Sequence, residues 1–388
     1  MTEPRLYMDW NATAPLDPAA RDAVLSALSL PGNASSVHRE GRAARAVIET
    51  ARRDVAALVG TKPAHVVFTS GATEASSLAL SPVLRMGRAP LAVSHLYVSA
   101  IEHPAIRAGG RFPADRVTEI PVTPAGVVDL DALSALLLAH DTAAGLPMVA
   151  VMLANNESGI VQPVAEVAEI VRRAGGVFVV DAVQAAGRLP LSLAAIGCDF
   201  LILSSHKIGG PKGAGALVSA GEVMMPPPLV TGGGQEKGHR SGTENVAAIA
   251  GFGAAARMAA ENLEARNAAI AARRDGIEAG MRRLAPDVII HGVDGPRLAN
   301  TSFFTLPGLP AETGQIAFDL EGVALSAGSA CSSGKVGESH VLVAMGQDAR
   351  RGALRLSIGT TTSDADAERF LAVFGKIAAR RRKTDAAA

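Results

Sequence analysis

The stretch LILSSHKIGGPKGAGAL, which runs from Leu201 to Leu217, decides how the chain folds. An apolar run ends at a histidine and a lysine, and a glycine-rich turn then leads into a second apolar run. Lysine is among the residues least often buried, so Lys207 at the inner end of an apolar strand needs an explanation. Three interpretations are open: a phosphate-binding loop, a chemically reactive Lys207, or a simple turn.

Further apolar runs of similar length flank this stretch. They are rich in Val, Leu and Ile and bounded by Gly, Pro or polar clusters, as expected of buried strands. The runs cover residues 66–70, 91–100, 147–154, 176–182, 199–205 and 215–220. Helical patterns lie between several of them, for example at 44–60 and 163–176. Strands that alternate with helices predict an α/β fold with a mostly parallel sheet.

The composition of the chain changes after about residue 250. A helical pattern rich in Ala, Arg and Glu covers 253–284, a strand-like segment lies at 352–359, and a last helix is expected at about 363–382. These features predict a second, smaller α+β domain. We expect the following boundaries: 16–258 for the large domain, and 1–15 with 259–388 for the small one.

Composition and charge argue against several functions. The 388 residues are 48% hydrophobic and 19% charged, which predicts a large core rather than disorder. The 37 basic and 37 acidic residues give a formal net charge of zero, which argues against a nucleic-acid partner. We expect no signal peptide and no membrane span, because no run approaches the roughly 18 apolar residues required. The two cysteines, Cys198 and Cys331, lie far apart, so we expect no disulfide and a cytoplasmic location.

Polar and ionisable side chains follow five of the predicted strands. Parallel α/β sheets bind ligands beyond the carboxyl ends of their strands, so we expect these groups to converge. In chain order they are Ser70 to Glu74, Glu102 with His103, Asn155 to Glu157, Asp181 with Gln184, and Ser204 with His206 and Lys207.

The chemistry of these groups suits one cofactor. The turn SGATE opens a helix at Ala72, whose first backbone N–H groups, with the Thr73 hydroxyl, can hold an anion such as phosphate. Asp181 is costly to bury without a cation, which a protonated ring nitrogen would supply. A desolvated Lys207 can form an imine with an aldehyde. Phosphate, pyridinium nitrogen and aldehyde together describe pyridoxal 5′-phosphate.

Other interpretations of single motifs remain. SGATE alone is equally consistent with an ordinary helix start, and His103 or His206 alone with a structural histidine. The phosphate-loop interpretation of GGPKGAG is weak, because that motif requires Ser or Thr after its lysine and glycine follows Lys212.

Taken together, the motifs resemble those of the cysteine desulfurases, the NifS/IscS-like group of the class V aminotransferase superfamily. The matching stretches follow the family order over nearly the whole chain: YMDWNATAPLDP, GNASSVHREGR, VVFTSGATEAS, SAIEHPAI, LANNESGIVQP, VDAVQAAGRLP, SSHKIGGPKGAGAL, GGGQEKGHRSGTEN, SAGSACSSG and LRLSIG. The resemblance implies the aspartate aminotransferase-like fold of PLP-dependent transferases (fold type I). This fold has a large domain with a mostly parallel central sheet and a smaller α+β C-terminal domain.

The resemblance also implies a role for each matching residue. Lys207 forms the imine with the cofactor and moves protons, while His103 stacks on the cofactor ring and acts as acid or base. Arg355 binds the substrate carboxylate, for which a guanidinium is suited, and Asn156 also contacts the substrate. Thr243 is a cofactor contact that reaches the phosphate in the neighbouring subunit of a homodimer. The remaining cofactor contacts are Ala72, Thr73, Asn156, Asp181, Gln184, Ser204 and His206.

The implied reaction converts L-cysteine to L-alanine and leaves the sulfur on Cys331 as a persulfide. Cys331 is the nucleophile, Cys198 is structural, and no metal is expected. A sulfur-acceptor or scaffold protein is the expected partner, in iron–sulfur cluster or thio-cofactor biosynthesis. The alternatives are a selenocysteine lyase, another PLP enzyme of the superfamily such as a transaminase or β-lyase, and an inactive scaffold that keeps the fold.

Overall fold

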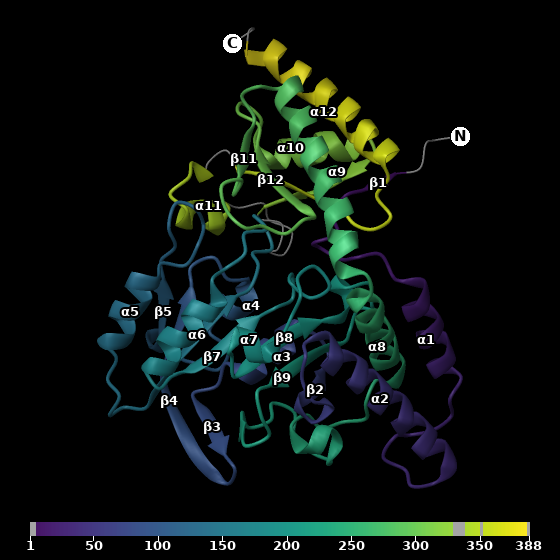
Figure 1. Ribbon diagram of the computed structural model, residues 1–388, viewed down its shortest axis with the longest axis vertical. Helices are drawn as coiled ribbons and strands as arrows, with labels where there is room; N and C mark the ends of the chain where they lie inside the picture. Colours follow the sequence, from purple (N-terminus) through teal and green to yellow (C-terminus); the bar gives the residue numbers. More distant parts are fainter. Residues whose placement is uncertain (1–4, 329–337, 350–351, 386–388) are drawn as a thin grey trace.

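A nine-stranded sheet forms the lower part of the molecule in Figure 1. The structure is a computed structural model that describes residues 5–328, 338–349 and 352–385. The strands lie in the order β10-β3-β4-β6-β7-β8-β9-β2, and β5 also pairs with β4. Their bounds are β2 Val66–Thr69, β3 Val83–Met86, β4 Ala89–Ser99, β5 Val117–Ile120, β6 Leu146–Met152, β7 Val177–Asp181, β8 Phe200–Ser204, β9 Gly215–Ser219 and β10 Met224–Met225.

The centre of this sheet is parallel. Strands β5, β4, β6, β7 and β8 pair in parallel, and β9 runs antiparallel between β8 and β2. The predicted α/β fold with a mostly parallel sheet is confirmed, and the six predicted apolar runs correspond to β2, β4, β6, β7, β8 and β9. The antiparallel extension through β3 and β10 was not predicted.

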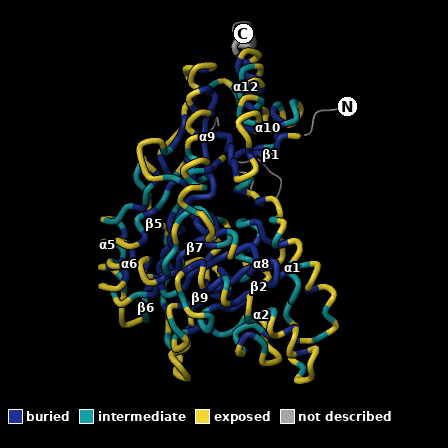
Figure 2. Tube along the Cα trace, turned by 45° about the vertical axis from the view of Figure 1, so that its right-hand side comes forward, coloured by how far each residue is buried: buried dark blue, intermediate teal, exposed yellow. Residues whose placement is uncertain are grey.

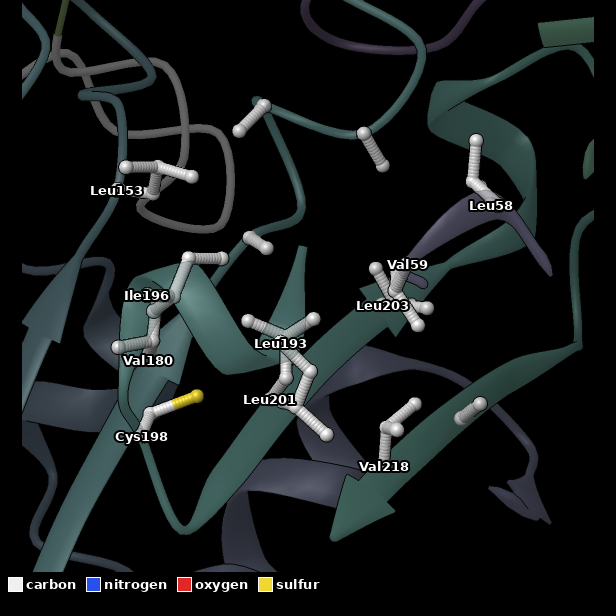
Figure 3. Packing of buried hydrophobic residues seen from close by; sticks show 14 of the residues in the cluster. Leu58, Val59, Leu153, Val180, Leu193, Ile196, Cys198, Leu201, Leu203 and Val218 are labelled. Atoms are coloured by element: carbon white, nitrogen blue, oxygen red, sulfur yellow. The ribbon is translucent and has the colours of Figure 1, made fainter. Parts of the chain in front are cut away.

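Helices cover both faces of the sheet because successive strand residues point to opposite sides. Val180 and Leu201 pack in the same core as the helices of one face, and Val179 and Ile202 pack with those of the other. Figure 3 shows the first core from close by, and Figure 2 shows that the strands are buried while the outer helical turns are exposed. The first face carries α2 Arg39–Leu58, α5 Leu130–Leu138, α6 Val164–Arg173, α7 Leu193–Ile196 and α8 Val246–Ala260; the second carries α3 Ala72–Ala79 and α4 Pro104–Arg107. Helix α1, Pro18–Leu28, packs on α8.

A four-stranded antiparallel sheet in the order β11-β12-β15-β14 lies in the upper part of Figure 1. A separate hydrophobic core, which includes Met8, Phe304, Phe318 and Phe374, joins it to its helices. We propose that this core belongs to the predicted small domain, residues 1–15 and 259–388. The elements are β1 Leu6–Tyr7, α9 Leu263–Leu284, β11 Ile289–His291, β12 Thr301–Thr305, α10 Ala311–Leu320, β13 Val323–Ala324, β14 Ser326–Ala327, α11 His340–Ala344, β15 Leu354–Ser357 and α12 Asp364–Asp385.

The predicted continuous helix over 253–284 is wrong in one respect. The chain leaves the helix after Ala260 and re-enters it at Leu263, with Asn262 in the left-handed conformation (φ 50°). Asparagine adopts this conformation more readily than most residues, so it can interrupt the helix at this point. The break separates α8, which packs on α1 and α2, from α9, which packs on α12 and β12.

Within the described residues, none of the helices combines the length and the apolar character needed to cross a bilayer.

Candidate active site

A cavity of about 600 Å³ opens at the carboxyl ends of the parallel strands. The structure brings all five predicted strand ends to its wall. The predicted site residues that line it are Ala72, Thr73, His103, Asn156, Asp181, Gln184, Ser204, His206 and Lys207. Arg355 and Thr243 are not among the lining residues, and Cys331 lies outside the described part of the chain.

Lys207 ends a single 3-10 turn, Ser205–Lys207, that follows β8 directly. Its Nζ donates hydrogen bonds to the backbone carbonyls of Asn11 at 2.6 Å and Ala12 at 2.9 Å. The N-terminal segment thus holds the amine at the cavity. Lysine is suited to imine chemistry at such a site because its pKa responds readily to desolvation and to neighbouring groups.

Asp181 is the last residue of β7 and is only 9% exposed. Its Oδ1 accepts the backbone N–H of Val183 at 2.9 Å. Burial raises the pKa of Asp181 to about 6, although the Val183 hydrogen bond and the charge of Lys207 act in the opposite direction. A cation in the cavity would stabilise the ionised carboxylate, and a protonated ring nitrogen is such a cation.

His103 precedes α4 and caps it, because its Nδ1 accepts the backbone N–H of Ala105 at 3.1 Å. Burial lowers the pKa of His103 to about 4, and the charges of Lys207 and His340 add to the effect. The imidazole is therefore neutral at pH 7 and carries its proton on Nε2, since Nδ1 is the acceptor. A neutral ring of fixed tautomer can stack on a cofactor and exchange one proton at Nε2.

The start of α3 provides an anion site at the same cavity. Among the described residues, no side chain caps this helix, so its first backbone N–H groups are left for a ligand. Strand β9 approaches the turn closely at Gly215, where a Cβ atom would lie 2.6 Å from the Gly71 carbonyl carbon. His206 also lines the cavity, and its Nδ1 is 3.1 Å from Thr13 Oγ1. Burial, with Lys207 and Lys212, lowers the pKa of His206 to about 4.

These groups fit pyridoxal 5′-phosphate. One cavity presents a lysine amine for the aldehyde, a buried aspartate for the ring nitrogen and an uncapped helix start for the phosphate. The glycines of GGPKGAG serve the backbone turn: a Cβ atom at Gly210 would lie 2.1 Å from Ser205 Oγ. Lys212 of the same stretch is exposed and lines the cavity.

Gln184 and Asn156, the two amide residues predicted to contact the cofactor, also form hydrogen bonds with the N-terminal segment and with the small sheet, respectively. Gln184 donates from Nε2 to the Asn11 carbonyl at 2.9 Å and accepts a hydrogen bond from Arg188 at Oε1. The backbone carbonyl of Asn156 accepts from Nη1 of Arg355 at 2.9 Å. Arg355 is only 3% exposed, and its guanidinium also pairs with Asp9. In this structure it therefore lies behind the cavity wall and contacts a residue of that wall, but it does not line the cavity itself.

Asn11 is a structural centre of the site that the sequence did not reveal. Its side chain is fully buried and bonds Thr301 Oγ1 and Asn300 Nδ2 of the small-sheet region, each at 2.9 Å. Its backbone carbonyl accepts from both Lys207 and Gln184. The sequence feature that could have indicated this role is the pair of polar residues, Asp9 and Asn11, within the apolar segment LYMDWNATAP.

Glu157 contacts residues on both sides of segment 329–337. Ser339 Oγ donates to its Oε2 at 2.6 Å, and Nδ1 of His340 lies 3.9 Å from its Oε1. On the other side, a Cβ atom at Gly328 would lie 2.7 Å from the same Oε2. Burial raises the pKa of Glu157 to about 7, although Ser339 and Arg355 act to lower it.

Replacement of this residue, Glu157→Gln, is expected to weaken the dependence of stability on pH. The carboxyl has an ordinary pKa of 4.5 and a folded value of about 7, so its stabilising proton is fully bound below pH 4.5 and is lost as the pH rises through 7. The loss corresponds to roughly 3 kcal/mol. Calorimetric unfolding midpoints should therefore fall more in the wild type than in the variant between about pH 5 and about pH 8.

Glu119→Gln is the matched control, because Glu119 is exposed and pairs with Arg107 at the surface. It should follow the wild-type pH response. An unchanged pH response in Glu157→Gln would show that Glu157 does not titrate between the two pH values.

Thr243 is exposed and lies in the loop that precedes α8. Three ion pairs hold this loop to other described residues: Arg240 with Glu74 at 3.0 Å, Lys237 with Glu222 at 2.6 Å, and the buried pair of Glu236 with Arg52 at 2.7 Å. The loop is thus fixed relative to the start of α3, and the Thr243 side chain remains accessible.

Comparison with known proteins identifies similar chains over almost the whole length. The sequence profile described as "Aminotransferase class-V" matches residues 6–370. The chain is 38% identical to the "IscS-like cysteine desulfurase" of Mycobacterium tuberculosis over 98% of both chains. It is 41% identical to a "Cysteine desulfurase" of a Frankia species, over 92% of this chain and 87% of that one. The solved NifS-like protein of Rickettsia africae superposes with a TM-score of 0.85 at 34% identity, over 96% of this chain and 99% of that one.

Proposed function

The chain belongs to the class V aminotransferase family, and we propose that it is a pyridoxal 5′-phosphate-dependent cysteine desulfurase that converts L-cysteine to L-alanine. The observation that carries the proposal is the single cavity lined by Lys207, Asp181 and His103. The names of relatives over nearly full length agree with it. We further propose that the enzyme is a cytoplasmic homodimer in which Thr243 reaches the partner's site.

Each residue of the cavity has a task in this reaction. When bound, the cofactor accepts electrons from the substrate carbon next to the amino group. Lys207 would hold the cofactor by its aldehyde group and would move protons at Nζ, while Asp181 would stabilise a protonated ring nitrogen. His103 would hold the ring and exchange a proton at Nε2. Asn156 belongs to both the cofactor and the substrate contacts, and the start of α3 with Thr73, Ser204 and His206 holds the phosphate.

The sulfur transfer requires a nucleophile, for which we propose Cys331. Its thiolate attacks the sulfur of L-cysteine, and a sulfur–sulfur bond forms as the carbon–sulfur bond breaks. The electron pair of the broken bond stays with carbon, which gains a proton and becomes the methyl group of L-alanine. Arg355 binds the substrate carboxylate. The persulfide on Cys331 then passes its sulfur to an acceptor protein for iron–sulfur cluster or thio-cofactor synthesis.

Product analysis of the purified holoenzyme with L-cysteine tests the proposal. Without dithiothreitol, L-alanine should appear in a burst of about one per active site, followed by a slower release as the thiol of excess L-cysteine discharges the persulfide. With dithiothreitol, turnover should continue and release equal amounts of sulfide and L-alanine. Pyruvate and ammonia in place of alanine would identify a β-lyase. Alanine from L-selenocysteine but not from L-cysteine would identify a selenocysteine lyase, and either result would overturn the desulfurase assignment.

A further inference from the structure

The guanidinium of Arg355 is already held by a carboxylate of the same chain. Its Nη2 lies 2.6 Å from Oδ1 of Asp9, and the two side chains are only 4% and 17% exposed. The second carboxylate oxygen of Asp9 accepts a hydrogen bond from Ser326 Oγ at 2.8 Å. Both oxygens of Asp9 are thus engaged, which fixes the geometry of a largely buried ion pair.

Backbone pairing fixes Asp9 beside β15. Asp9 forms a parallel bridge with Ser357, and the backbone N–H of Trp10 donates to the carbonyl of Ser357 at 3.2 Å. Ser326 pairs in register with Arg355 itself. Asp9 is therefore held beside Arg355 by the backbone as well as by the ion pair.

Arg355 nevertheless keeps capacity for a second anion. Its Nη1 donates to the Asn156 carbonyl, whereas Nε is buried and has no acceptor among the described residues. An arginine offers five N–H donors in a planar fork, and carboxylates typically take two of them. A carboxylate that reached Nε would satisfy a donor that is otherwise left unpaired.

The position of Arg355 links this pair to the substrate. Asn156, to which it is bonded, lines the cavity beside Asp181 and Lys207. A substrate carboxylate that binds Arg355 will therefore lie near the carboxylate of Asp9. Two like charges on one buried guanidinium repel each other, since little water is present to screen them.

We propose that Asp9 is a positioning residue that sets the affinity of the site for the substrate carboxylate. It orients Arg355 and neutralises its charge before substrate binds, and it then opposes the incoming carboxylate. The inference rests on the proposed role of Arg355 as the substrate-carboxylate site. It explains why a buried cation is stable behind the cavity wall.

Asp9→Asn tests this inference, because the amide keeps the shape and removes the charge. We expect KM for L-cysteine to fall by about tenfold and kcat to stay within about threefold, as for a change in ground-state binding. The dissociation constant of L-alanine, measured by calorimetry with the holoenzyme, should fall by the same factor. L-cysteinamide, which lacks the carboxylate, should bind the wild type and the variant equally. Asp9→Glu, which restores the charge, should return KM most of the way to the wild-type value.

Asp319→Asn is the matched control, because Asp319 also pairs with an N-terminal arginine, Arg5, but at the surface. It should leave KM unchanged. In an Arg355→Ala background, Asp9→Asn should have no effect on alanine binding. If Asp9→Asn does not fold, Asp9→Ser carries the same expectations.

An increased or unchanged KM for L-cysteine in the neutral Asp9 variant would overturn the inference. It would also be overturned if the variant bound L-cysteinamide more tightly than the wild type by the same factor. These outcomes are distinct from failure of the proposed function. A wild type without desulfurase turnover would overturn the function, whereas the alanine calorimetry would still test Asp9.

Discussion

Lys207→Ala is expected to abolish L-cysteine turnover, with a loss of at least about 10³-fold in kcat. The lysine is the cavity amine that the carbonyls of Asn11 and Ala12 hold, so the variant lacks the group proposed to form the imine. Borohydride reduction of the wild type should attach the cofactor to the Lys207 peptide, located by mass spectrometry. The variant should show no label on that peptide.

Lys212→Ala is the matched control for Lys207, because Lys212 lines the same cavity in the same glycine-rich stretch. It should retain turnover within about threefold and the label on Lys207. Lys207→Arg keeps the positive charge but cannot form the imine, so it should be folded and inactive. Turnover in Lys207→Arg, or cofactor attached at Lys212, would contradict the assignment.

Cys331→Ser is expected to abolish the formation of both sulfide and L-alanine from L-cysteine, with a loss of at least about 10²-fold. A serine hydroxyl at this position cannot accept the substrate sulfur as a persulfide. After a single turnover without reductant, mass spectrometry of the wild type should find one additional sulfur atom on the Cys331 peptide. That mass should be missing from the variant, although the cofactor should remain bound.

Cys198→Ser is the internal control for this experiment. Cys198 packs with Val180 and Ile196 in the core of the large sheet, as Figure 3 shows, and burial raises the pKa of its thiol. Such a thiol is unreactive, so kcat should be unchanged, while the buried hydroxyl should cost about 1–3 kcal/mol of stability. Full activity in Cys331→Ser would refute the persulfide route, and loss of activity in a folded Cys198→Ser would show that the two cysteines were wrongly assigned.

The sequence predicted the large sheet and the convergence of the cavity residues well, for a physical reason. Buried parallel strands have continuous apolar sequences, and their carboxyl ends lie at the same edge of the sheet. Asp181 and Ser204, at the ends of β7 and β8, could therefore be placed in one site without any knowledge of side-chain geometry.

Other parts of the site could not be predicted because they depend on contacts between distant segments. The pairing of Arg355 with Asp9 joins residues 346 positions apart, and no local pattern marks it. The role of Asn11 likewise depends on Thr301 and Asn300, which only the packing of the two sheets brings to it. The break at Asn262 was missed because alanine-rich sequence on both sides favours continuous helix.

The dependence of Asn11 on distant strands bears on how the enzyme matures. The segment that positions Lys207 is synthesised long before Thr301 and Ser357, which fix it. At about 5–20 residues per second, the 346 positions that separate Asn11 from Ser357 take roughly 17–70 s to be made. During that time the large sheet can fold, but the carbonyl groups that will hold its lysine are not yet fixed in place. Loading of the cofactor in its final geometry is therefore expected to follow the synthesis of β15.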